Sequence, residues 1–290
     1  MAADGEGFFD RAGEPGGQGL LRPPADRRAA HAAAFGLLLR RPGHSAARTL
    51  TPSQRRAFAR LFALIGIAVL VAPSTIAACL GWSGALFFFA VLAFRVRVYV
   101  AGASRASPAA PVAGALEDWP VYTLLIALKD EAETAAQLAA AIRALDYPAD
   151  KLDVKLLIEA GDTATLSALR CERWPAGTEL LVVPPGNPRT KPRALNYGLA
   201  RARGAFVVVY DAEDRPHPDQ LKAAVRAFAA AGSSLACVQA PLAGEGGRGW
   251  IAGQWALEYA VQFGRVLPGL ARLGLPVMLG GTSNHFSGLM

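Results

Sequence analysis

Hydrophobic and polar residues follow three successive patterns along the chain. The first part is rich in Gly, Ala, Pro and Arg and has no sustained hydrophobic period apart from a short stretch around Ala32 to Leu39. The second contains no charged residue from Leu61 to Phe94. Beyond a Pro/Ala/Ser segment at Ser104 to Gly114, short apolar runs alternate with amphipathic stretches of helical length. We therefore predict a largely disordered segment, a transmembrane helical part and an α/β domain, over residues 1–54, 55–103 and 115–290 respectively.

The uncharged run from Leu61 to Phe94 is too long for a buried globular helix and for a single membrane crossing. It predicts a hairpin of two transmembrane helices, Leu61–Leu80 and Ala85–Val100, with the break at Gly81–Gly84. The alternative is a pair of buried helices in a large soluble core. Basic residues flank both ends of the run, which predicts a multi-pass protein of the inner (cytoplasmic) membrane with both flanks cytosolic. These residues are Arg55, Arg56, Arg60, Arg95 and Arg97.

The third part has the alternation of an α/β domain, in which the short apolar runs are strands. Ala205–Tyr210 is almost wholly apolar, as in a parallel strand buried on both faces. A long helix is predicted at Trp250–Val266. The pattern predicts a mostly parallel sheet whose other strands are Val121–Ala127, Val154–Ile158, Glu179–Val183, Leu235–Gln239 and Val277–Leu279.

Composition supports a membrane protein and argues against a nucleic-acid-binding one. Hydrophobic residues make up 52% of the chain and charged residues only 18%, so some apolar surface is expected to face lipid. The formal net charge of +7 comes mostly from arginines that are scattered or flank the apolar run. They do not form the basic stripe with aromatic platforms that a nucleic-acid binder needs. Three isolated cysteines, Cys79, Cys171 and Cys237, are typical of buried thiols rather than a disulfide framework.

Acidic residues follow three of the predicted strands. In an open parallel sheet, ligands bind beyond the carboxyl ends of the strands, so polar residues there are candidates for a binding site. Each acid taken alone also fits an ordinary turn residue or helix N-cap. Their recurrence at the same edge of the sheet favours a site, and they are Asp130, Glu131, Glu159, Asp162, Asp211, Glu213 and Asp214.

The acids after the fourth strand have the chemistry of a divalent metal site. Asp211 and Glu213 are two residues apart after a wholly apolar run, and Asp214 follows. Carboxylate oxygens are hard ligands that suit Mg²⁺ or Mn²⁺. A metal ion there would bridge the phosphates of a nucleotide diphosphate and stabilise it as a leaving group.

At this point the sequence resembles the inverting family-2 glycosyltransferases of the GT-A fold, over about Val121 to Phe286. The acids after the fourth strand are similar to the family's Asp-x-Asp metal motif, with Glu213 in the second position and Asp214 next to it. Asp130 and Glu131 match its first acidic pair. By the same resemblance the nucleotide base would bind to Asp162, with Glu159 as the competitor.

Two further segments carry the resemblance. Lys191 to Asn196 is similar to the family's Lys-x-x-Ala-Leu-Asn segment, which implies a cation near the nucleotide phosphates, where the helix N-terminus also favours an anion. A glycine-containing segment resembles the one that lines the donor-sugar and acceptor region. Its residues are Gly281, Thr282, Ser283, Asn284 and His285. Taken singly, His285 is more typical of a loop residue than of a base.

The predicted membrane helices point to the cellulose-synthase-like branch of that family. The resemblance then implies a hexosyltransferase of polysaccharide biosynthesis, with a UDP-sugar as expected donor, a glycan or lipid as acceptor, and the bilayer as partner. Trp255 and Tyr259 would lie on one helix face near the membrane interface. The family's general base belongs to a Thr-Glu-Asp motif expected beyond Met290. We therefore expect a C-terminally truncated chain with low activity unless another polypeptide supplies the remainder.

The expected lack of the base favours a non-catalytic, membrane-anchored module that binds nucleotide sugars or serves assembly. A nucleotidyltransferase should have a Gly-rich phosphate loop after its first strand, whereas the sequence Leu128–Ala132 has no glycine. A Walker-type ATPase is disfavoured because no Gly-x-x-x-x-Gly-Lys-Ser/Thr occurs.

Overall fold

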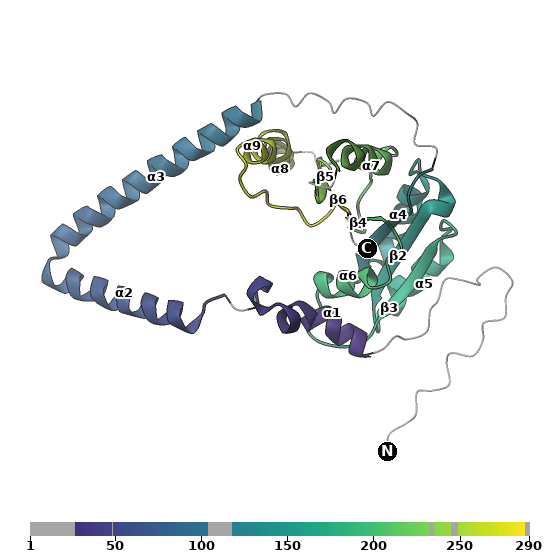
Figure 1. Ribbon diagram of the computed structural model, residues 1–290, viewed down its shortest axis with the longest axis horizontal. Helices are drawn as coiled ribbons and strands as arrows, with labels where there is room; N and C mark the ends of the chain where they lie inside the picture. The colour runs from purple at the N-terminus through teal and green to yellow at the C-terminus, as the bar shows by residue number, and fades with distance from the viewer. Residues whose placement is uncertain (1–26, 48, 104–117, 233–234, 245–248, 288–290) are drawn as a thin grey trace, which may run out of the picture. The chain divides into compact units, whose positions relative to one another are not determined.

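The predicted α/β alternation is present in the computed structural model, which describes residues 27–47, 49–103, 118–232, 235–244 and 249–287. Six strands form one sheet in the order β3-β2-β1-β4-β6-β5. Strands β1 to β4 pair in parallel, while β6 is antiparallel to both β4 and β5. The mostly parallel α/β fold is therefore confirmed. The strands, labelled in Figure 1, are β1 Tyr122–Leu128, β2 Leu152–Glu159, β3 Thr178–Val183, β4 Phe206–Tyr210, β5 Cys237–Gln239 and β6 Asn284–Ser287.

Helices cover both faces of this sheet, because its central strands are apolar on both faces. Successive residues of β2 point to opposite faces: Leu156 and Ile158 belong to one buried cluster, and Leu157 to another. The first cluster is completed by α4 (Ala135–Arg143), α5 (Thr163–Cys171) and α7 (Gln220–Ala231). The second is completed by α6 (Lys191–Leu199) and by the first part of α1 (Arg27–Arg40).

Helix α1 corrects the prediction of disorder for the N-terminal segment. Ala30 and Ala33 are buried against the second cluster, and the Asn196 side chain donates a hydrogen bond to the Ala33 carbonyl at 2.9 Å. The small side chains let α1 lie close to the domain, but they give the sequence too weak a hydrophobic period to reveal the helix. Residues 1–26 and the predicted linker at 104–114 lie outside the described residues.

The apolar run is broken at Ala72, not at Gly81–Gly84 as the sequence predicted. Helix α2 spans Pro52–Val71 and α3 spans Pro73–Ala103, so Gly81 and Gly84 are inside a continuous helix. Proline has no backbone N–H and restricts the residue before it, and Ala72 has non-helical backbone angles (φ −146°, ψ 66°). A glycine inside a helix costs only about 1 kcal/mol, which the surrounding apolar sequence tolerates.

Among the described residues, α3 is the one helix that is long and apolar enough to cross a membrane. Its 31 residues correspond to about 46 Å, more than the roughly 30 Å of a bilayer's hydrocarbon core. The uncharged part of α2 is only the stretch from Leu61 to Val71, which is too short to cross by itself. The predicted two-helix hairpin therefore remains a prediction.

Helix α3 packs closely on a second helical segment of the same compact unit. The predicted helix from Trp250 is observed as α8 (Trp250–Val261), a π-helical turn (Gln262–Val266) and α9 (Leu267–Arg272). A Cβ atom added to Gly102 would lie 1.9 Å from the Arg265 carbonyl oxygen, and one added to Gly269 would lie 2.1 Å from that of Val98. Only glycine fits at these two positions. This packing places α8 and α9 in the same compact unit as α2 and α3, whereas β1 to β6 belong to the other compact unit, called the sheet unit below.

The last strand also differs from its prediction. Val277–Leu279 is irregular and exposed, and the strand is β6, made of Asn284, His285, Phe286 and Ser287. This polar sequence has no hydrophobic alternation to indicate a strand. Asn284 and His285 are buried, and Phe286 and Ser287 half-buried, because β6 pairs on both sides, with β4 and with β5.

Candidate functional site

The strand order places a topological switch point between β1 and β4. The chain passes from β1 to β2 and β3 on one side, then returns to form β4 on the other side of β1. Ligands of open α/β sheets bind at such a point, outside the carboxyl ends of the strands. Asp130 and Glu131 follow β1, and the turn from Asp211 to Asp214 follows β4.

The carboxylates of the Asp211 turn face different surroundings. Asp214 is turned inward, where its Oδ2 accepts hydrogen bonds from the Asp211 N–H (2.7 Å) and from the Thr282 hydroxyl. Burial raises the pKa of Asp214, the hydrogen bonds oppose this, and the nearby charges of Asp211 and Glu213 add to it. Glu213 is exposed and the Asp211 side chain is 30% exposed. Asp211 and Glu213 are therefore the accessible acids of the turn, and Asp214 stabilises its backbone.

Lys191 is the first residue of α6 and reaches the same turn. Its Nζ forms an ion pair with Asp211 Oδ1 and donates a hydrogen bond to the Gly281 carbonyl at 2.8 Å. The Lys191 side chain is 33% exposed. A lysine, an aspartate and a backbone carbonyl from three separate segments thus converge at the carboxyl end of β4.

The acids after β1 and β2 are joined through the N-terminus of α5. Asp162 caps α5 by accepting the Thr165 N–H at 3.1 Å, and its other oxygen accepts the Asp130 N–H at 2.8 Å. The Thr165 hydroxyl accepts the Glu131 N–H at 2.9 Å. Burial acts to raise the pKa of Asp162, but these hydrogen bonds outweigh it and the pKa is lowered. Asp130 has a left-handed backbone (φ 58°), which Asp tolerates better than most residues.

Glu159 is engaged by an arginine that sequence reasoning did not single out. Arg193, with a nearly inaccessible side chain, donates from Nη1 to both Glu159 oxygens at 3.2 and 3.3 Å and from Nη2 to the Pro184 carbonyl. Its position after Lys191 and Pro192 gave no sign that it points into the protein. Of the two candidates for the nucleotide base, Glu159 is thus held in a buried ion pair, while Asp162 lies at the loop after β2.

The glycine-containing segment divides into two parts. The Gly281 carbonyl and the Thr282 hydroxyl contact the site through Lys191 and Asp214. Ser283, Asn284 and His285 are buried, and the last two lie inside the sheet rather than in the expected loop. His285 Nδ1 is hydrogen-bonded to the Tyr122 hydroxyl at 2.7 Å, and burial lowers the pKa of His285 to about 4. This histidine packs in the core.

Within the described residues, no group of three or more Asp, Glu, His or Cys side chains converges as a metal site. Mg²⁺ is usually held by one or two carboxylates together with substrate phosphates and water. The accessible pair of Asp211 and Glu213 fits that donor set, in which the phosphates supply the remaining ligands.

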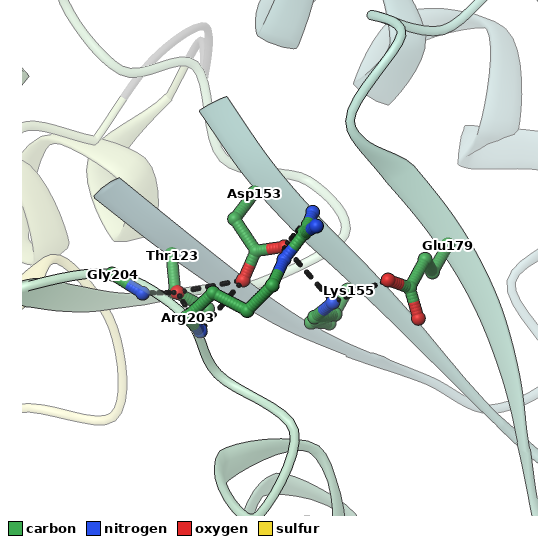
Figure 2. A network of polar contacts seen from close by, with 6 residues as sticks. All are labelled: Thr123, Asp153, Lys155, Glu179, Arg203 and Gly204. Carbon is green, nitrogen blue, oxygen red and sulfur yellow. Dashed lines mark hydrogen bonds and ion pairs between the residues drawn. The ribbon is translucent and has the colours of Figure 1, made fainter. Parts of the chain in front are cut away.

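A second polar network lies at the opposite ends of the strands (Figure 2). The carboxylate of buried Asp153 accepts hydrogen bonds from Thr123 (2.8 Å) and Arg203 Nε (2.8 Å) and lies 2.9 Å from Lys155 Nζ. Lys155 also contacts Glu179 at 2.8 Å. Burial acts to raise the pKa of Asp153, but the hydrogen bonds outweigh it and the pKa is lowered. Its charges are internally paired, which is typical of a structural network.

A family model matches a range that includes all of β1 to β5 and residues of both compact units. The family model described as "Glycosyltransferase like family 2" matches residues 120–284. No curated protein matches the chain.

Solved structures of glycosyltransferases are similar to parts of the chain. The mannosyltransferase PcManGT from Pyrobaculum calidifontis, solved with GDP-Man and Mn²⁺, is 29% identical over 55% of this chain and 46% of its own, with a TM-score of 0.44. Glucosyl-3-phosphoglycerate synthase from Mycobacterium tuberculosis, solved with Mn²⁺, UDP-glucose and phosphoglyceric acid, is 18% identical over 66% and 59%, with a TM-score of 0.38. TarS from S. aureus, solved with UDP-GlcNAc, is 18% identical over 44% and 36%, with a TM-score of 0.37. The chain spans less than two thirds of the length of each.

Proposed function

The chain belongs to the glycosyltransferase-like family 2, and from this premise we propose that it binds a nucleotide-diphosphate sugar for transfer to a glycan or lipid acceptor. The observation that carries the proposal is the convergence of Asp211 and Lys191 at the switch point between β1 and β4. A diphosphate needs positive charge, and this site can supply it in two ways. Asp211 can hold a metal ion, and Lys191 places an ammonium at the N-terminus of α6.

Within this proposal, Asp211 and Glu213 would hold Mg²⁺ or Mn²⁺. When bound, the metal neutralises the diphosphate and makes it a better leaving group. Lys191 contributes a point charge to the same phosphates. Asp162, with Asp130 and Glu131 on the adjoining loop, would bind the nucleoside, because Asp162 already fixes this loop through the Asp130 N–H. Gly281 and Thr282 would border the donor sugar. UDP-sugars are the expected donors and a hexose the expected sugar.

Inverting transfer also requires a general base to take the proton from the acceptor hydroxyl. The carboxylates of Asp214 and Asp162 already accept backbone N–H groups. We therefore assign neither Asp214 nor Asp162 to that role.

A lipid bilayer is the second proposed partner. The support is α3, because no residue in its most apolar stretch is buried. The exposed aromatic residues Trp250 and Trp255 of α8 belong to the same compact unit. Tryptophan is enriched where a protein meets the membrane interface. We propose an inner-membrane location with the sheet unit on the cytosolic side, where nucleotide sugars are available.

The test is calorimetric titration of the detergent-solubilised chain with UDP, GDP and their sugar conjugates, with and without Mn²⁺. We expect metal-dependent binding that Asp211→Asn weakens at least about tenfold, which corresponds to about 1.4 kcal/mol, because the variant removes the charge of a proposed metal ligand. Asp146→Asn is the matched control: Asp146 pairs with Lys222 at 2.7 Å outside the site, so binding should not change.

Two outcomes separate the alternatives. Binding without transfer from any donor would favour the non-catalytic, nucleotide-sugar-binding module. Absence of binding to every nucleotide, with or without metal, would contradict the proposed function.

A further inference from the structure

The ion pair between Lys191 and Asp211 joins three parts of the candidate site. Lys191 belongs to the N-terminus of α6, Asp211 follows β4, and Gly281, whose carbonyl the same ammonium contacts at 2.8 Å, precedes β6. Both side chains are about one third exposed, 33% for Lys191 and 30% for Asp211. The pair is therefore within reach of a solvent cation.

We propose that Lys191 acts as an internal cation that competes with the divalent metal for Asp211, an inference that rests on the proposed function. A hard metal ion binds the carboxylate oxygens directly, and the ammonium of Lys191 is ion-paired with one of those oxygens. Two cations at one carboxylate repel each other. Metal binding then displaces Lys191 from Asp211 and frees its ammonium for the donor's phosphates.

This competition couples the two ligands of the site. A nucleotide diphosphate that attracts Lys191 withdraws it from Asp211 and so raises the affinity for the metal. By thermodynamic linkage, the metal raises the affinity for the nucleotide by the same factor. Lys191 is suited to this exchange because its charge is carried on a flexible four-carbon chain. The chain would thus hold metal weakly until a diphosphate is present.

The test measures Mn²⁺ binding by the loss of the free-ion electron paramagnetic resonance signal, with the full chain in detergent. Without nucleotide, Lys191→Met should bind Mn²⁺ about fivefold or more tightly than the unsubstituted chain, a change at the low end of usual coupling factors. UDP or GDP should raise Mn²⁺ affinity by a smaller factor in Lys191→Met than in the unsubstituted chain, because only the direct ligation of the metal by phosphate oxygens then couples the two ligands. Lys191→Arg keeps the positive charge and should retain the weak nucleotide-free binding.

Lys222→Met provides the matched control, because it removes a lysine from the ion pair with Asp146 and should leave Mn²⁺ affinity unchanged. Lys191→Gln is a second neutral variant, expected to behave like Lys191→Met, and unfolding temperatures show that each protein is folded. A folded Lys191→Met or Lys191→Gln chain that binds Mn²⁺ no more tightly would overturn the inference, even with metal-dependent nucleotide binding intact. If the unsubstituted chain binds neither Mn²⁺ nor nucleotide, the proposed function fails as well.

Discussion

At the scale of single residues, the buried guanidinium of Arg193 connects the ends of β2 and β3 to the helix that carries Lys191. It pairs with Glu159 and donates to the Pro184 carbonyl, while the Glu159 side chain is only 11% exposed. Replacement by methionine would leave the Glu159 charge buried without its partner. We expect Arg193→Met to lower the free energy of unfolding by about 3–5 kcal/mol, measured by denaturant or thermal unfolding in detergent.

The double variant Glu159→Gln with Arg193→Met is the control for this interpretation. It removes both charges, so its loss of stability should be clearly smaller than that of Arg193→Met alone. An equal or larger loss in the double variant would mean that side-chain packing, rather than the ion pair, dominates at this position.

The sequence predicted the edge of the sheet that carries the candidate site, but not how its side chains pair. Acids after β1, β2 and β4 could be grouped because the carboxyl ends of parallel strands share one edge. The inward turn of Asp214 toward Thr282 and the pairing of Glu159 with Arg193 depend on which side chains face each other after packing. Neither spacing nor residue type encodes that information.

At the scale of secondary-structure elements, Gly102 and Gly269 allow α3 to contact the π-helical turn and α9 backbone to backbone. Arg272 Nη1 strengthens this packing by donating to the Ala101 carbonyl, near the end of α3, at 2.8 Å. A methyl group on Gly269 would overlap the Val98 carbonyl, and backbone cannot move aside as a side chain can. We expect Gly269→Ala to destabilise the chain by about 1–3 kcal/mol, seen as a lower unfolding temperature in detergent.

Gly253→Ala in α8 is the matched comparison, because an added Cβ there meets nothing within 4 Å. Alanine is favoured over glycine inside a helix by about 1 kcal/mol, so this variant should be as stable as the unsubstituted chain or more stable. Equal behaviour of the two variants would contradict the close helix packing.

Secondary-structure elements made of apolar runs could be predicted from the sequence. Elements that are buried through polar or small side chains could not. Strands β1 to β4 follow from their hydrophobic runs, because their burial requires such residues. The polar strand β6 depends on having two neighbouring strands, and α1 on close packing through alanines. Local helix propensity predicted a break at the glycines of α3, but it does not include the stabilising effect of the helix on either side of them. The helix continues through these glycines, and the break lies at Pro73, just after α2.

At the scale of the whole molecule, two forces could hold the chain at a bilayer, and they respond differently to salt. The net charge of +7 would attract it to anionic lipids, an interaction that is screened at high ionic strength. Insertion of α3 depends on apolar surface and persists in salt. Because the uncharged part of α3 is exposed, we expect insertion to be the stronger of the two.

We therefore expect the chain to stay with phosphatidylcholine liposomes during flotation in about 1 M salt, where the Debye length is about 3 Å. Phe87→Arg with Phe88→Arg, both exposed in the middle of α3, should reduce the recovered fraction, because each charge at the bilayer centre costs about 2.5–3.5 kcal/mol on insertion scales. Leu39→Arg, at an equally exposed apolar residue of α1, should leave recovery unchanged. Release by salt, or equal loss in both variants, would mean that surface charge rather than α3 holds the chain to lipid, and the proposed membrane location would lose its support.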